Sequence, residues 1–322
     1  EGSGIRAHTV RLKPETFEQI IALVALYRPG PLKSGMVDDY IRRKHGQEKI
    51  RYLLPELKEV LEETYGVIVY QEQVMKIATL IGGFSMGEAD NLRKAISKKV
   101  EAELDRLKDR FLEGAKKRRI PVQKAAEIYR LIRHFGGYGF NKSHSAAYAL
   151  VAYQTAYLKA HYPVAYMAAL LTSEAERTDK LMRYVHHCRE LGIPMDPPDV
   201  NSGVWEFAVN RDRISFGLGA IKNIGASAVE AILAARASGP FRSLWDFCER
   251  VDLRKVNKRV IESLIKAGAF DSISGGRRAA LLAALDQAME RAARVLNERE
   301  SGQISLFDGV GAGSEAEAST IP

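Results

Sequence analysis

Three prolines within one short segment constrain the fold of this chain more than any other feature. Pro194, Pro197 and Pro198 lack an amide N–H and fix their own backbone angle. Residues 194–199 therefore exclude regular structure and are typical of a rigid extended linker. Apolar residues at helical spacing dominate before this linker, whereas alternating and glycine-rich segments follow it. We expect a mainly α chain with domains at residues 1–195 and 196–309 and a flexible tail at residues 310–322.

Composition narrows the class of protein. The 322 residues are 46% hydrophobic, which is enough for a substantial core, and they carry 48 Lys and Arg against 40 Asp and Glu. The resulting charge of +8 favours a polyanionic partner without requiring one. Cys188 and Cys248 are too few for a disulfide framework, which fits a reducing cytoplasm. No apolar run approaches the roughly 20 residues of a membrane span, so we expect no membrane partner.

The first residue also carries an expectation. Glu1 is not Met, and the residues after it form neither a basic nor an apolar region of a signal peptide. We expect a chain that is not exported and that is a piece of a longer protein.

The segment from Phe135 to Pro163 is the strongest candidate for chemistry. Gly136, Gly137 and Gly139 permit a tight loop, and Ser143 or Ser145 is expected to cap the helix that follows. That helix is predicted by the spacing of Tyr148, Val151, Thr155, Leu158 and Tyr162. Its N-terminus, together with donors from Asn141, Lys142 and His144, suits a phosphate group. The alternative is an ordinary loop and cap whose lysine faces water.

A second basic segment lies at residues 87–99. Arg93, Lys94, Lys98 and Lys99 are closely spaced on a predicted helix and its exit. A solvated basic face is the alternative to phosphate binding here. Two nearby features are more ambiguous. The β-prone residues 66–70 are either a short strand or a buried helix start, and residues 28–31 are expected to stop a helix in a rigid turn.

Beyond the linker, the pattern predicts a β-hairpin and a phosphate-gripping turn. Residues 204–209 alternate, residues 210–212 form a turn, and residues 213–216 return. Residues 217–225 and the following helix at 226–236 resemble a helix-hairpin-helix motif, in which backbone N–H groups hold DNA phosphates without reading sequence. The residues concerned are Lys222, Asn223, Ile224 and Gly225. A structural tight turn is the alternative, and a degenerate second copy at residues 260–278 makes it weaker.

Some chemistry is absent from the sequence. Transfer of a nucleotidyl group by two metals needs carboxylates fixed a few ångströms apart, commonly as Asp-x-Asp on a strand, and no such motif occurs. No phosphate-binding Gly-Lys-Ser/Thr loop or paired nucleophile and base is present either. The adjacent His186, His187 and Cys188 lack the second cluster that a tetrahedral metal site needs, so we expect no metal site. This chain alone should not polymerise nucleotides.

Residues 137–148 read Gly-Tyr-Gly-Phe-Asn-Lys-Ser-His-Ser-Ala-Ala-Tyr, which resembles the fingers signature of the alpha subunits of bacterial replicative DNA polymerase III. Residues 25–46, 66–75 and 87–99 are similar to the same family. The resemblance implies a multi-helix fingers domain, followed by a small domain with a β-hairpin and tandem helix-hairpin-helix motifs. It implies that catalytic aspartates and their Mg²⁺ lie in a part that precedes residue 1, and that an oligonucleotide-binding domain follows.

The same resemblance assigns roles. The incoming dNTP triphosphate would be held by Arg93, Lys94, Asn141, Lys142, Ser143 and His144. Tyr138 or Phe140 would pack on its sugar or base, and an ordinary core aromatic is the alternative for either residue. The family usually has two arginines where this chain has Arg93 and Lys94, so Lys94 keeps the charge but loses the bidentate geometry toward phosphate. Gln303, Ser305, Leu306 and Phe307 lie in a pentapeptide similar to the one that binds the sliding clamp.

The implied partners are template-primer DNA, dNTP, the clamp and other replicase subunits. Two other interpretations stay open: a non-catalytic DNA-binding and clamp-docking module, and the error-prone polymerase paralogue of the same family.

Overall fold

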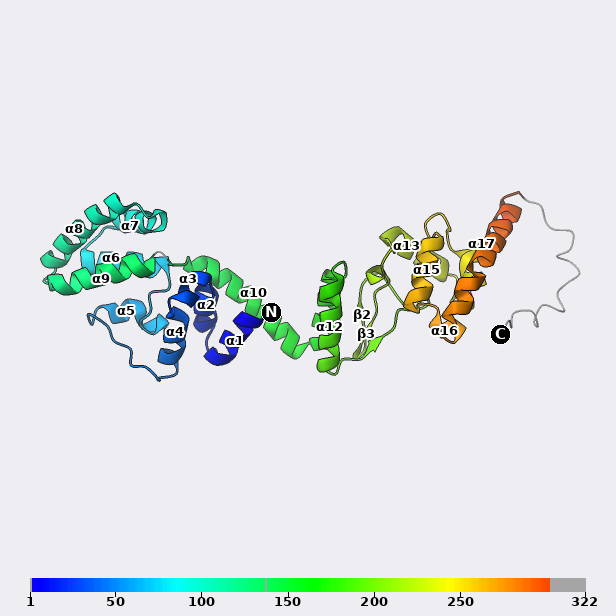
Figure 1. The fold of residues 1–322 in the computed structure, drawn as a ribbon, viewed down its shortest axis with the longest axis horizontal. Coiled ribbons are helices and arrows are strands. Elements are labelled where there is room, and N and C mark those ends of the chain that lie inside the picture. The colour runs from blue at the N-terminus through cyan, green and yellow to red at the C-terminus, as the bar shows by residue number, and fades with distance from the viewer. Residues whose placement is uncertain (1, 137, 302–322) are drawn as a thin grey trace, which may run out of the picture. The chain divides into compact units, whose positions relative to one another are not determined.

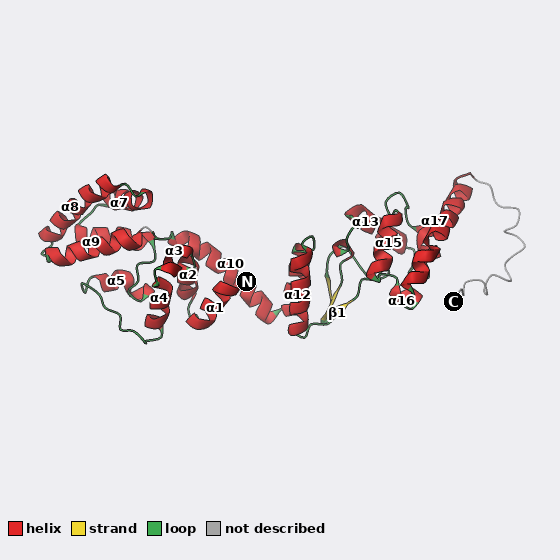
Figure 2. Cartoon of the chain, viewed as in Figure 1, coloured by secondary structure: helices red, strands yellow, loops and turns green. Residues whose placement is uncertain are grey.

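The computed structural model describes residues 2–136 and 138–301, and helices dominate it (Figure 2). The described residues form 17 α-helices, two 3₁₀ helices and one three-stranded sheet, so the expected mainly α class is confirmed. The residues divide into two compact units, residues 1–156 and 157–322. Among the described helices, none combines the length and the apolar character that a membrane crossing requires.

Among the described residues of the first unit, all the labelled elements are helices (Figure 1). Its elements are α1 (Ser3–Leu12), α2 (Phe17–Leu26), α3 (Pro29–Lys33), α4 (Met36–Lys44), α5 (Leu57–Leu61), η1 (Glu62–Thr64), α6 (Gln71–Gly82), α7 (Met86–Lys98), α8 (Glu101–Lys117), α9 (Val122–Gly136) and the first part of α10 (Lys142–His161). Helices α5 to α9 enclose one apolar core, and α2, α4 and residues 67–70 enclose a second.

Two local expectations for this unit are now decided. Residues 28–31 do not form only a turn, because Pro29 opens the short helix α3. Proline suits the first helical position, where its missing N–H would have no partner in any case. Residues 67–69 belong to no helix or strand, and Tyr70 pairs with Phe140 in an isolated parallel bridge before α6 begins at Gln71. The β-prone segment is therefore neither a sheet strand nor a helix start.

The second unit begins within α10 and adds the only sheet among the described residues. Its elements are α11 (Pro163–Ser173), α12 (Thr178–Glu190), β1 (Met195–Asp196), β2 (Ala208–Asn210), β3 (Arg213–Ser215), η2 (Leu218–Ala220), α13 (Ala226–Arg236), α14 (Leu244–Arg250), α15 (Lys258–Ala267), α16 (Asp271–Ser274) and α17 (Arg278–Ser301). The strand order is β1-β3-β2, with β2 antiparallel and β1 parallel to β3.

The predicted β-hairpin is confirmed, although its first strand is shorter than expected. The carbonyl groups of Val204 and Trp205 accept hydrogen bonds from Leu218 and Gly219, at 2.8 and 3.0 Å. Because these carbonyls are used by the segment after β3, the paired part of β2 starts only at Ala208.

The proline linker differs from the expectation. It contains strand β1, and the carbonyl of Pro194 accepts a hydrogen bond from Ile214 at 3.0 Å. A proline at a sheet edge keeps its acceptor, so the linker pairs on one side only. Helices α11 and α12 also share an apolar core with Phe207 and Ile214, beyond the linker. Contacts divide the chain between residues 156 and 157. The domain boundary expected at residues 195 and 196 stays a prediction.

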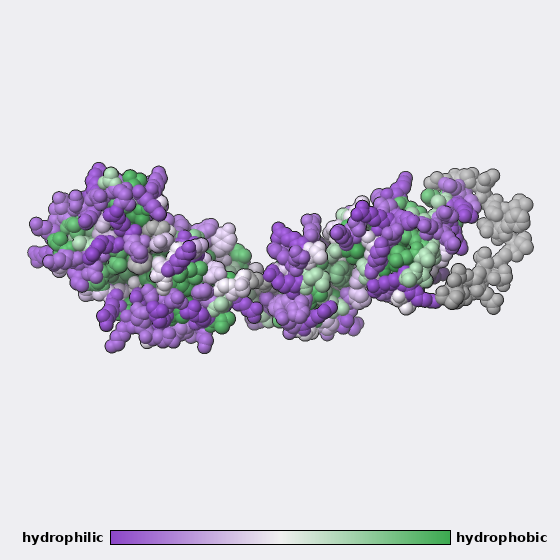
Figure 3. All heavy atoms as spheres, in the orientation of Figure 1, coloured by the Kyte–Doolittle hydropathy of each residue, from purple (hydrophilic) through white to green (hydrophobic). Residues whose placement is uncertain are grey.

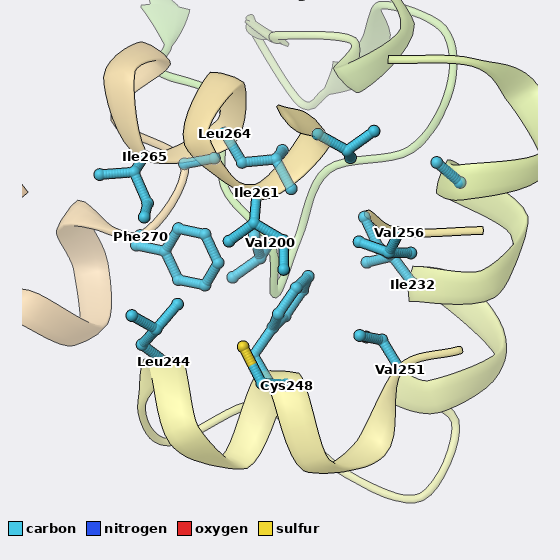
Figure 4. Close-up of a cluster of buried hydrophobic side chains, with 14 of the residues drawn as sticks. Val200, Ile232, Leu244, Cys248, Val251, Val256, Ile261, Leu264, Ile265 and Phe270 are labelled. Carbon is cyan, nitrogen blue, oxygen red and sulfur yellow. The ribbon is translucent and has the colours of Figure 1, made fainter. Parts of the chain in front are cut away.

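A larger core holds the rest of the second unit together (Figure 4). Phe247 lies between Phe241 and Phe270, with ring centroids 4.8 and 5.0 Å away in edge-to-face geometry. Edge-to-face pairs stabilise a core beyond the area that they bury. Cys248 lies in the same core, fully enclosed. In the view of Figure 3, hydrophilic residues cover most of the surface of each unit.

Candidate phosphate-binding sites

The loop before α10 is fixed by backbone pairing to a distant segment. Phe140 donates its N–H to the carbonyl of Val69 at 3.0 Å, and its own carbonyl accepts from the N–H of Gln71 at 2.9 Å. These bonds place the loop beside the start of α6. The side-chain nitrogen of Gln71 adds a third bond, to the carbonyl of Gly139 at 3.3 Å. The N-terminus of α10 is therefore anchored before the helix begins.

The cap of α10 differs from the one expected. The side-chain oxygen of Asn141 accepts from the N–H of His144 at 2.9 Å, which is the geometry of an N-cap residue. Neither of the two serines caps the helix. Ser145 lies inside the first turn, where its hydroxyl donates to the carbonyl of Lys142 at 3.0 Å. Asn141 has the shorter reach to the third N–H because it directly precedes the helix.

Two carboxylates occupy the charged end of α10. Both oxygens of Glu72 lie 3.1 Å from the backbone nitrogen of Lys142, at the positive end of the helix dipole. The ammonium group of Lys142 pairs with Glu63 at 2.6 Å and lies 5.3 Å from the ring centre of Tyr70. Burial raises the pKa of the Tyr70 phenol, and the charges of Glu63 and Glu72 raise it further. The site therefore carries its own anions.

The second basic segment lies on α7, as the sequence predicted. Ser85 and Glu88 form a reciprocal capping box at its start, which fixes where the helix begins. Asp90 pairs with both basic residues, with Arg93 at 2.7 Å and with Lys94 at 2.7 Å. Hydrogen bonds from Lys94 and then Arg93 hold the pKa of Asp90 below its ordinary value. Asp90 therefore pairs with both cations but balances the charge of only one of them.

Gln71 connects the two basic segments. Its side-chain oxygen lies 3.4 Å from a guanidinium nitrogen of Arg93, while its side-chain nitrogen reaches Gly139 in the loop. The structure therefore brings Arg93 and the glycine loop to one place. Lys94 has no such link to the loop among the described contacts.

Aromatic and basic side chains surround the exposed part of the loop. Tyr138 is 38% exposed, and its carbonyl accepts a hydrogen bond from Arg28. The guanidinium of Arg28 lies 4.4 Å from the ring centre of Phe140. A side chain at Gly30 would collide with the Tyr138 ring, because an added Cβ would lie 2.4 Å from it. Arg28 was not predicted as part of this site, because no sequence pattern links it to a loop that lies 110 residues further along the chain.

The second unit holds the predicted hairpin between η2 and α13. Asn223 adopts a left-handed backbone conformation, with φ at 71°, which turns the chain toward the helix start. Within the described part of the chain, the N–H groups of Lys222, Asn223 and Gly225 make no hydrogen bond, and Lys222 makes no ion pair. The N–H of Ile224 instead bonds to the carbonyl of Ile221 at 3.2 Å. The hairpin is thus open to an acceptor.

The degenerate second copy folds as helices α15, α16 and α17 with glycine turns between them. Gly268 has φ at 88°, and the added Cβ would lie 2.2 Å from the guanidinium of Arg278. Arg278 pairs with Asp271 at 2.5 Å. The side-chain nitrogen of Asn223 reaches Ser263 at 3.2 Å, so the first hairpin is tied to this second element.

Two further expectations concern metals and the clamp peptide. The described residues contain no group of three or more His, Cys, Asp or Glu side chains placed to hold a metal ion. His187 instead lies 2.8 Å from Glu190. Gln303, Ser305, Leu306 and Phe307 lie outside the described residues.

Comparisons with known proteins agree with this architecture. Residues 1–119 match the family model of the bacterial DNA polymerase III alpha subunit finger domain, and residues 192–280 match a helix-hairpin-helix motif. Similar curated proteins named DNA polymerase III subunit alpha come from Vibrio cholerae (49% identical, 95% of this chain), Pseudomonas aeruginosa (46%, 98%) and Escherichia coli K12 (49%, 95%).

This chain spans 27 to 29% of the length of these relatives. The matched positions lie on both sides of the proline linker. The chain therefore belongs to the family of bacterial DNA polymerase III alpha subunits, of which it matches the part that carries the finger domain and the helix-hairpin-helix motif.

Proposed function

We propose that the first unit binds the triphosphate of an incoming dNTP in a DNA-directed DNA polymerase. The carrying observation is that Arg93 and Gly139 both contact Gln71, because this joins two basic segments into one site. Guanidinium, ammonium and helix N-terminal N–H groups are the donors that phosphates accept. The proposed ligands are Arg93, Lys94, Asn141, Lys142, Ser143 and His144. The exposed Tyr138 would pack on the sugar or base.

In this proposal the triphosphate replaces the internal carboxylates. Asp90, Glu63 and Glu72 now neutralise the cations and the helix end. The ion pairs of Lys142 and Lys94 are exposed, and such pairs contribute only about 0.2–1 kcal/mol each, so a highly charged ligand displaces them at small cost. The freed cations would then stabilise the charge that develops on the departing pyrophosphate.

The nearby carboxylates do not fit a Mg²⁺ site. Each of Glu63, Glu72 and Asp90 is bonded to a basic group or to a backbone N–H. No step in this proposal therefore uses a metal bound by these residues. Any catalytic metal would be held by parts of the polymerase outside this sequence.

Single-nucleotide incorporation by the intact polymerase tests the triphosphate site. Arg93→Ala and Lys142→Ala should each lower kcat/KM for dNTP about tenfold to over a hundredfold, which corresponds to about 1.5–3 kcal/mol for a lost charged contact. Arg106→Ala is the matched control, because Arg106 is an exposed helix arginine paired with Glu103. Wild-type kcat/KM in both site variants would contradict the proposed triphosphate site.

We also propose that the second unit holds duplex DNA through the hairpin at residues 222–225. Its support is the set of N–H groups that, like Lys222 beside them, have no partner among residues 2–136 and 138–301. Contacts to phosphates carry no sequence information, so binding should be weak, independent of sequence and steeply dependent on salt.

The pentapeptide at residues 303–307 is proposed to bind the sliding clamp. Replacing Leu306 and Phe307 together with Ala should weaken clamp binding at least about a hundredfold, since each buried apolar side chain contributes about 1.5–3 kcal/mol. Titration of clamp against wild-type and doubly substituted chains measures this. Equal affinities would identify a chance match.

The alternatives make different demands. A non-catalytic module for DNA and clamp binding needs no nucleotide site, so dNTP binding that depends on Lys142 separates it from a polymerase. An error-prone paralogue would lack strong clamp binding. In either polymerase case this chain alone should not extend a primer at any Mg²⁺ concentration, and template-dependent incorporation by the purified chain would contradict that.

A further inference from the structure

A cleft of about 410 Å³ opens beside the hairpin of the second unit. One wall is formed by the end of α11, with Thr172, and by the turn before α12, with Glu176. The other wall is formed by residues 219–224, and Trp205 and Glu206 line the space between them. The cleft therefore adjoins the same N–H groups that are proposed to hold DNA phosphates.

Trp205 is fixed at this cleft by backbone and side-chain contacts, yet a large part of its side chain is exposed to solvent. Its carbonyl accepts from the N–H of Gly219 at 3.0 Å. Its indole also lies against Gly219, where an added Cβ would come within 2.7 Å of two ring carbons. Only glycine permits this contact. The side chain nevertheless remains 41% exposed, which is unusual for the largest apolar residue.

The charges of the cleft discriminate between the parts of a nucleotide. Among the described residues, the carboxylates of Glu176 and Glu206 have no hydrogen-bond or ion-pair partner, and both line the cleft. They disfavour a phosphate inside the cleft and accept hydrogen bonds from the amino groups of bases. Lys222 and the open N–H groups lie at the hairpin, where a phosphate is favoured.

We propose that this cleft binds an unpaired nucleobase of DNA, stacked on Trp205, while the adjoining phosphate lies on the hairpin at residues 222–225. The inference rests on the proposed contact between hairpin and DNA and extends it to single-stranded or frayed positions. Aromatic side chains beside a backbone-binding surface are a common way to hold single strands. The site would make the second unit prefer a junction between duplex and single strand over a continuous duplex.

Fluorescence of Trp205 provides the test. The chain has two tryptophans, and Trp245→Phe leaves Trp205 as the only one. This variant is titrated with a blunt duplex and with the same duplex carrying a single-stranded overhang. The overhang should quench the emission and tighten binding about fivefold to over a hundredfold, the range for one stacked base. Equal affinity and equal emission for the two DNAs would overturn the proposal.

Two variants separate this inference from the proposed hairpin contact. Trp205→Leu keeps apolar bulk against Gly219 but removes the aromatic face, so it should abolish the preference for the overhang and leave blunt-duplex affinity unchanged. Trp205→Phe should restore most of the preference. Lys222→Ala should weaken binding of both DNAs equally.

The outcomes are distinguishable. If Lys222→Ala leaves both affinities unchanged, the proposed hairpin contact is wrong. If Lys222→Ala weakens binding of both DNAs and Trp205→Leu still prefers the overhang, the hairpin contact stands and only the stacking site is wrong. Should Trp205→Leu not fold, the quenching experiment decides alone.

Discussion

The two candidate phosphate sites of this chain differ in how their positive charge is balanced. In the first unit, Lys142 pairs with Glu63, Arg93 pairs with Asp90, and Glu72 lies at the N-terminus of α10. In the second unit, Lys222 has no partner within the described residues, and its neighbouring N–H groups are open. One site is internally neutralised and the other is not.

Under the proposed function, this difference predicts different ligands for the two sites. A neutralised site binds only an anion that competes successfully with several carboxylates, which favours a compact ligand with several negative charges such as a triphosphate. An open hairpin binds any phosphate with little discrimination, which suits a protein that moves along DNA. Selectivity in the first unit would then come from its acidic residues as much as from its basic ones.

Removal of a core aromatic side chain should have the largest effect, because it destabilises the second unit and not the first. Phe247→Ala leaves a cavity between Phe241 and Phe270, and a change of this kind costs about 3–5 kcal/mol. We expect the second unit to lose duplex binding and to melt at lower temperature, while a transition of the first unit is unchanged. Calorimetry with DNA titration measures both. A shift of the first unit's transition by the same amount would show that the units do not unfold independently.

Neutralising an internal carboxylate of the first unit should strengthen nucleotide binding there. Glu63→Gln frees Lys142, so we expect the KM for dNTP of the intact polymerase to fall by up to about fivefold, the equivalent of an exposed ion pair of about 1 kcal/mol or less. Glu59→Gln is the control, since Glu59 lies on the adjacent helix α5 outside these pairs. A raised KM would show that Glu63 positions Lys142 and does not compete with the nucleotide.

The smallest expected effect concerns salt. Lys222→Ala should reduce the salt slope of duplex binding by about one counterion. Between 50 and 200 mM salt, the affinity of the variant should therefore fall about 3.5-fold less than that of the wild type. Fluorescence anisotropy at several salt concentrations measures the slope. An unchanged slope would mean that Lys222 does not contact phosphate.

The sequence was informative about local structure. Apolar spacing predicted α10, and alternation predicted the β2–β3 hairpin, because both patterns repeat within one element. Helical spacing of three and four residues also offered a signal for the pairs between Asp90 and the two basic residues after it. The spacing did not reveal what α10 buries, since Tyr148 and Val151 on its predicted face are 59% and 56% exposed.

Long-range contacts were beyond sequence reasoning. Glu63 and Glu72 lie 79 and 70 residues before Lys142, and no pattern connects them. The cap was misjudged because several residues near the start of α10 are capping types, and only the backbone path decides which one precedes the helix. The pairing of the proline-rich segment was not predicted either, because proline composition does not show that such a segment can pair along one edge of a sheet.

The enclosed thiols have a practical consequence for spectroscopy. Burial raises the pKa of Cys188, and burial followed by the charge of Glu249 raises the pKa of Cys248 to about 12. Because the thiolate is the form that maleimides attack, both native cysteines should stay unlabelled near neutral pH while the chain is folded. A single cysteine introduced at an exposed position would then carry a fluorophore or spin label without removal of the native pair, and slow labelling of the wild-type chain would report its opening.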